Sequence, residues 1–132
     1  MITAVDTNVL LDVFLPDPQF LESSRSRLRR AYDEGSLVIC SIVYAELAPR
    51  FQKKTQLDEA LDALGVTVGR LDEEMCFLAG DRWRRYRASG GKRERIISDF
   101  LIAAHAVVRA DRFLTRDRGF YKTYFPRLAR LE

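Results

Sequence analysis

The sequence lacks the residues from which most small zinc and thiol sites are built. It contains one histidine and two cysteines in 132 residues, and Cys40 and Cys76 have neither motif spacing nor histidine neighbours. A zinc site needs several such ligands at short intervals, so none is expected. The two cysteines are instead expected to be small buried residues of a reduced chain, which favours the cytoplasm.

Long apolar runs are also missing. No stretch approaches the roughly 20 residues that span a bilayer, and Asp6 interrupts the only N-terminal run that resembles a signal peptide. No internal repeat, low-complexity segment or long linker divides the chain. With 47% hydrophobic and 31% charged residues, the composition is that of an ordinary globular protein. We therefore expect a single domain over residues 1–132 that does not enter a membrane.

The balance of charge is modest, with 22 lysines and arginines against 19 acids and a net charge of +3. The distribution of these charges matters more than the total. Acids that gather in one site leave the remaining surface more basic, and a basic surface favours a polyanionic partner.

Apolar periodicity predicts that strands alternate with helices. Buried strands are expected at residues 2–5, 37–40 and 113–115, with a weaker strand signal at 66–68 and a candidate edge strand at 128–131. Helical spacing predicts helices that follow Thr7, cover residues 20–34, follow Ser41, open at Thr55, start at Asp72 and follow Ser98, with a helical turn at 120–124. This alternation indicates an α/β fold in three layers, α/β/α, with a central parallel sheet.

Four acids are expected at one edge of that sheet, because the carboxyl ends of parallel strands meet there. Asp6 follows the first strand, and Asp117 follows the strand at 113–115. Glu46 lies in the second turn of the helix after the second strand. Asp99 lies in the first turn of a strongly apolar helix, where the helix dipole favours a carboxylate.

Four carboxylates in one pocket repel one another, because the effective dielectric constant there is low. A hard divalent cation such as Mg2+ or Mn2+ relieves the repulsion, since it takes oxygen ligands and bridges carboxylates to phosphate. It also lowers the pKa of a bound water, so no cysteine or histidine nucleophile is needed. The residues alone leave two alternatives open: this metal site, or a set of separate helix caps and salt bridges.

The motifs around the four acids resemble those of a PIN domain. They are Asp6-Thr7-Asn8 after the first strand, Glu46 in Ser41-x-x-x-x-Glu, Asp99 in Asp-Phe-Leu-Ile-Ala-Ala-His-Ala, and Asp117 in Thr-Arg-Asp-Arg-Gly-Phe-Tyr. Their order over nearly the whole chain is most similar to the VapC ribonuclease toxins of prokaryotic toxin–antitoxin pairs. A phosphatase of the haloacid dehalogenase kind would need Asp-x-Asp where this chain has Asp6-Thr7-Asn8.

The resemblance implies a Mg2+- or Mn2+-dependent endoribonuclease that cuts structured RNA, such as transfer or ribosomal RNA, and inhibits translation. It implies a homodimer and a small VapB-type antitoxin whose C-terminal segment blocks the acidic groove. Asp6, Glu46, Asp99 and Asp117 would be the catalytic, metal-binding acids, with Asn8 and Thr115 as supporting polar groups. A stand-alone RNA-processing nuclease and a PIN-like binding module without catalysis are the alternatives.

Basic residues crowd the segment before Asp99 and flank Asp117. We interpret them as contacts to RNA or antitoxin, because arginine pairs bidentately with phosphate or carboxylate; a solvated helix face is the alternative. Arg116 and Arg118 either clamp a phosphate beside the metal or pair with nearby acids. Asp12 and Asp81 are expected to be exposed helix acids. The members of the basic set are Arg85, Arg87, Lys92, Arg93, Arg95, Arg116 and Arg118.

Overall fold

The strands form a parallel sheet that has the order β3-β2-β1-β4. The computed structural model describes residues 1–90, 96–129 and 131, and the sheet in this part of the chain has four strands. They are β1 (Ile2–Val5), β2 (Ser36–Cys40), β3 (Val66–Gly69) and β4 (Arg112–Leu114). Every neighbouring pair is parallel, so all four carboxyl ends lie at one edge, as predicted.

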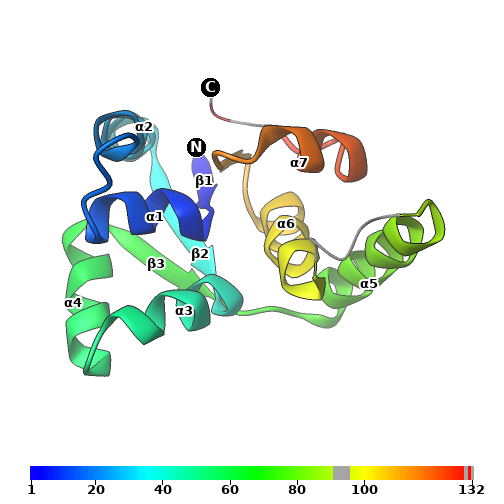
Figure 1. Ribbon diagram of the computed structural model, residues 1–132, viewed down its shortest axis with the longest axis horizontal. Coiled ribbons are helices and arrows are strands. Elements are labelled where there is room, and N and C mark those ends of the chain that lie inside the picture. Colours follow the sequence, from blue (N-terminus) through cyan, green and yellow to red (C-terminus); the bar gives the residue numbers. More distant parts are fainter. Residues whose placement is uncertain (91–95, 130, 132) are drawn as a thin grey trace.

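Helices cover both faces of the sheet. Figure 1 shows α1, α2 and α4 on one side and α5 and α6 on the other. Helix α6 packs on β1 and β4, α2 packs on β2, and α4 packs on β3. The predicted three-layer α/β/α architecture is therefore confirmed. The bounds are α1 (Thr7–Phe14), α2 (Leu21–Glu34), α3 (Ser41–Leu47), a 3-10 turn η1 (Ala48–Arg50), α4 (Lys54–Ala63), α5 (Glu73–Ala88), α6 (Ile97–Arg109) and α7 (Arg118–Tyr124).

Burial explains why some elements were easier to predict than others. In the central strand β1, Thr3, Ala4 and Val5 are all buried, and Phe100 and Ala103 of α6 pack into the same core. The edge strand β3 buries only Val66, which accounts for its weak apolar pattern.

An aromatic cluster fastens α7 to the two helices on its side of the sheet. Tyr86 of α5 and Tyr124 of α7 meet edge to face with ring centroids 5.3 Å apart. Phe100 of α6 and Phe120 of α7 meet in the same way at 5.1 Å. Edge-to-face pairs of this kind add to the burial energy of the rings. They anchor the helix that begins directly after Asp117.

Some local expectations were wrong. Cys40 is buried as predicted, but Cys76 is exposed because it lies on the outer face of α5. Helix α6 begins at Ile97, before the predicted cap Ser98. Residues 128–131 form no strand in the described part of the chain, although Phe113 of β4 donates to Ala129 O at 2.7 Å. None of the described helices has the length and apolar character needed to cross a membrane.

Candidate metal centre

Asp6 lies where β1 ends, and its side chain is only 6% exposed. Its backbone N–H donates to Leu114 O at 2.9 Å, which joins the ends of β1 and β4. One carboxylate oxygen, Oδ1, accepts from the Thr7 N–H at 2.8 Å, so that Asp6 itself caps α1, which begins at Thr7 rather than after it. The other, Oδ2, accepts from Thr115 Oγ1 at 2.7 Å. Asp6 is therefore both a helix cap and a member of the acidic group.

The environment of Asp6 disfavours its charged form. Burial raises the pKa of Asp6 from its ordinary value of 3.8 to about 6, and the charges of Glu46 and Asp99 add to the rise. The hydrogen bonds from Thr115 and Thr7 oppose it. Glu46 and Asp99 consequently lie within electrostatic reach of Asp6. A cation at this point would offset a repulsion that three carboxylates otherwise share.

Glu46 and Asp99 reach this edge from two different helices. The Thr7 hydroxyl donates to Glu46 Oε1 at 2.6 Å and so ties α3 to the first residue of α1. Asp99 is half-buried in the first turn of α6, where its Oδ2 accepts from the Ile96 N–H at 3.2 Å. Both carboxylates are held by protein donors, Glu46 near the end of α3 and Asp99 in the first turn of α6.

Asp117 is connected to Asp6 through Thr115. The buried Thr115 hydroxyl donates to Asp6 and accepts from the Asp117 N–H at 3.0 Å. Tyr121, four residues further on in α7, places its hydroxyl 3.5 Å from Asp6 Oδ2. Sequence reasoning missed Tyr121 and the Thr7 contact to Glu46. The sequence did contain a signal for each: Thr7 carries a hydroxyl directly after the strand-end acid Asp6, and Tyr121 carries one about one helical turn after Asp117.

The candidate ligands around Asp6 are of the kind that a hard divalent cation prefers, because they are carboxylate, amide and hydroxyl oxygens. Asn8 Oδ1 is buried and has no hydrogen-bond partner among the described residues. In that same part of the chain, no three side chains of the Asp, Glu, His or Cys type are grouped closely enough to hold an ion as they stand. Binding an ion would therefore require these side chains to move closer together.

The predicted basic contacts divide into several groups. Arg85 pairs with Asp81 at 3.2 Å, and the Arg87 guanidinium lies 5.5 Å from the Trp83 ring centroid. Asp81 is half-buried rather than fully exposed. The Arg116 guanidinium is paired with an acid, since it donates to Asp12 at 2.9 and 3.1 Å. Lys92, Arg93, Arg95 and the side chain of Arg118 lie outside the described residues.

Asp12 was wrongly expected to be an exposed acid. It is 3% exposed, because it faces α2 and the loop before α7 instead of solvent. Ser24 of α2 donates to its Oδ2 at 2.6 Å, in addition to the two bonds from Arg116. The pairing of Arg116 therefore favours the second of the two alternatives given for that residue, contact with a nearby acid.

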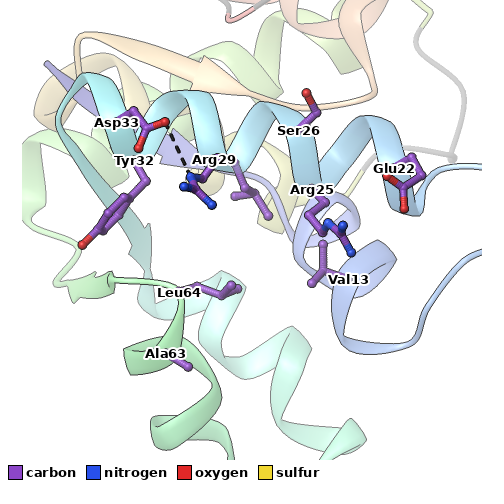
Figure 2. A pocket seen from close by; sticks show the side chains of 10 residues that line it. Val13, Glu22, Arg25, Ser26, Arg29, Tyr32, Asp33, Ala63 and Leu64 are labelled. Atoms are coloured by element: carbon purple, nitrogen blue, oxygen red, sulfur yellow. Dashed lines mark ion pairs between the residues drawn. The ribbon is translucent and has the colours of Figure 1, made fainter.

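A groove of about 780 Å³ lies between α2 and the end of α4, and none of the four acids lines it. Figure 2 shows Val13 and Leu64 facing the groove, with Tyr32 at one end and Arg29 at the rim. Arg29 pairs with Asp33 at 3.6 Å along the same helix. The groove thus combines an apolar floor with a charged rim.

Comparison with known proteins adds a family and a set of structures with the same fold. A family model described as PIN domain matches residues 3–126. VapBC2 from Rickettsia felis, solved with a DNA fragment from its promoter, is 22% identical with a TM-score of 0.74, over 99% of this chain and 98% of that one. VapBC-1 from nontypeable Haemophilus influenzae is 22% identical with a TM-score of 0.72, over 100% and 98%.

A toxin–antitoxin complex from Klebsiella pneumoniae is 19% identical with a TM-score of 0.63, over 90% of this chain and 89% of that one. At these identities the likeness establishes the fold. A comparison with curated protein sequences finds no match.

Proposed function

The chain belongs to the PIN-domain family, and from that premise we propose that it is a metal-dependent endoribonuclease. PIN domains are generally nucleases. The observation that carries the proposal is the buried Asp6 carboxylate, whose pKa is raised by burial and by two further acids that come from different helices. Such perturbed acids are typical of functional sites. We propose Asp6, Glu46, Asp99 and Asp117 as the catalytic acids.

In this proposal each side chain has a separate part. Asp6 is the fixed ligand, because Thr7 and Thr115 hold its two oxygens. Glu46 and Asp99 are the ligands delivered by α3 and α6, and Asn8 and Thr115 are supporting polar groups near the metal. A bound Mg2+ or Mn2+ would supply an activated water and neutralise charge on the phosphate that is attacked.

We propose further that the protein is the toxin of a toxin–antitoxin pair. It would cut structured RNA such as transfer or ribosomal RNA, act as a homodimer in the cytoplasm and be inhibited by a VapB-type antitoxin. The support is the family together with neighbours in fold that were solved as VapBC or toxin–antitoxin complexes. A stand-alone RNA-processing nuclease and a non-catalytic binding module are the competing functions.

The groove between α2 and α4 is our candidate for part of the antitoxin contact. An apolar centre with a polar rim that contains tyrosine and arginine is a composition found at protein interfaces. Purification from the native cell should recover a small protein with the chain, and Leu64→Glu, which places a charge in the groove, should lose it. Recovery of the chain alone, without a partner, would favour the stand-alone nuclease.

The activity is tested by incubation with total cellular RNA in the presence of Mg2+, Mn2+ or a chelator, followed by mapping of the new RNA ends. Asp6→Asn and Asp99→Asn should abolish discrete cleavage and leave the fold intact. Asp62→Asn changes an exposed acid of α4 and is the matched control. If the Asp6 and Asp99 variants still cut at the wild-type positions, the catalytic assignment is wrong.

A further inference from the structure

An ion pair between the buried Asp12 and the partly exposed Arg116 adjoins the acidic site in sequence and joins three segments of the chain. Arg116, which stands between Thr115 and Asp117, donates through Nε and Nη2 to the two oxygens of Asp12 at 2.9 and 3.1 Å. Its guanidinium lies 3.9 Å from the ring centroid of Phe20, and Ser24 donates to the same carboxylate at 2.6 Å. One carboxylate on α1 therefore fixes the start of α2 and the loop between β4 and α7.

Stability alone is a poor explanation for this arrangement. The pair has to offset the desolvation of the buried Asp12 carboxylate, and the Arg116 side chain, which is 31% exposed, is partly screened by solvent, so the net gain in stability is modest. What a bidentate arginine–carboxylate pair supplies is a defined geometry, because both the distance and the plane of the guanidinium are set. The aromatic ring of Phe20 restricts that plane further.

The loop that Arg116 anchors also carries the hydroxyl that contacts Asp6. Thr115 donates to Asp6 Oδ2 at 2.7 Å and accepts from the Asp117 N–H at 3.0 Å. The loop is thus attached to Asp6 through one hydroxyl and to Asp12 through two guanidinium N–H groups. A shift of the loop that breaks the contact between Arg116 and Asp12 also moves Thr115 relative to Asp6. Displacements of about 1 Å in an active site lower the rate of catalysis.

We propose that the Asp12–Arg116 pair is a positioning device that holds Thr115 and Asp117 against Asp6 in the geometry used for metal binding. The proposal rests on the proposed nuclease function, because that function gives Thr115 and Asp117 their roles. In this proposal Arg116 acts through its neighbours, as a positioning residue.

The test compares Arg116→Lys with a matched variant. Lysine keeps the positive charge beside Asp12 but lacks the rigid fork of donors. Asp12→Asn is the second variant, since the amide keeps the shape and one acceptor oxygen while the charge is lost. Arg30→Lys is the control, because Arg30 donates through Nε to Glu34 at 2.9 Å on the exposed surface of α2.

Two readouts separate positioning from general stability. The first is the Mn2+ concentration that gives half-maximal RNA cleavage. The second is amide hydrogen exchange of Asp117, compared with the amides of β1, which reports local opening without any need for metal or RNA. In Arg116→Lys we expect both the Mn2+ requirement and the Asp117 exchange rate to rise about tenfold, with β1 unchanged. Asp12→Asn should shift both in the same direction, and Arg30→Lys should match the wild type.

The proposal is overturned if Arg116→Lys and Asp12→Asn both keep the wild-type Mn2+ requirement and raise the amide exchange rates of Asp117 and β1 equally. That result would mean that the pair contributes only to general stability. If the wild-type protein cleaves no RNA with any metal, the nuclease function fails instead. The exchange comparison then still decides whether the pair holds the loop.

Discussion

At the residue scale, Asp6 combines two uses that conflict energetically. Its carboxylate caps α1 and receives the Thr115 hydroxyl, yet burial, Glu46 and Asp99 all disfavour its negative charge. Between pH 3.8 and about 6 the folded chain binds more protons at Asp6 than the unfolded chain does. The free energy of unfolding therefore falls as pH rises through this window and stays lowered above it.

We predict that Asp6→Asn stabilises the metal-free protein at pH 7.5, because a neutral amide does not carry the buried charge. A rise in the pKa of Asp6 from 3.8 to about 6 corresponds to a gain of about 1–3 kcal/mol. The measurement is urea denaturation of both proteins at pH 7.5 and pH 4, and the gain should vanish at pH 4, where Asp6 is protonated in the wild type. A variant that is less stable than the wild type at both pH values would contradict the electrostatic account of Asp6.

The same ionisation should appear in the metal requirement of the activity. A metal binds the ionised carboxylate, so protons compete with Mn2+ at Asp6. We predict that the Mn2+ concentration for half-maximal cleavage rises about tenfold for each pH unit below pH 6 and levels off above it. Cleavage assays at a series of pH values measure this. A requirement that stays constant down to pH 5 would show that Asp6 is not the competing group.

At the element scale, the ends of β1, β2 and β4 were predicted to within about one residue, because their cause is local, whereas the starts of α1, α4 and α6 were not predicted correctly. Asp6 and Thr115 were placed correctly at the sheet edge, because an apolar run that stops at a polar residue marks the end of a buried strand. Asp12 was not, since its burial depends on Ser24 and on Arg116, which is 104 residues away in sequence. Helical periodicity on α1 alone contains no information about either partner.

The end of α4 allows a matched comparison of two glycines. Gly65 has φ +71°, and a Cβ there would lie 2.6 Å from a ring carbon of Tyr32. Gly90, after α5, has φ +79° and no described heavy atom within 4 Å of such a Cβ. Both substitutions to alanine lose the freedom of glycine at positive φ, but only Gly65→Ala adds a steric clash.

We predict that Gly90→Ala lowers the free energy of unfolding by about 1 kcal/mol. Gly65→Ala should cost about 1 kcal/mol more, at the low end for overpacking because Tyr32 is 55% exposed and its ring can move. Urea denaturation of both variants measures the difference. Equal losses in the free energy of unfolding would mean that the clash between the added Cβ and Tyr32 does not affect stability.

At the scale of the whole molecule, the parallel sheet brings together residues that are far apart in sequence. The four proposed acids extend from Asp6 to Asp117, and each comes from a different element or loop. The sequence pattern was sufficient to predict the edge at which the parallel strands end, because that edge depends only on strand direction, and the meeting of all four acids there stays a prediction. It was not sufficient to predict the hydrogen bonds from Thr7 and Tyr121, which depend on side-chain packing.

If the four acids lie together at one edge, the rest of the protein surface is more basic than the net charge of +3 indicates. If that surface binds the RNA backbone, affinity must fall as salt rises, because phosphate contacts release counterions. We predict that RNA binding by the inactive Asp6→Asn variant gives a straight, negative slope of log affinity against log salt concentration. Fluorescence anisotropy with a labelled RNA measures it, and a slope near zero would exclude backbone contacts as the main source of binding.

We propose that the acids at the sheet edge bind a divalent cation, and calorimetric titration of Mn2+ into the purified protein measures that binding without RNA. We predict saturable Mn2+ binding to the wild type and to Asp62→Asn, and no saturation over the same concentration range with Asp6→Asn or Asp99→Asn. Equal Mn2+ binding by the wild type and both acid variants would contradict it.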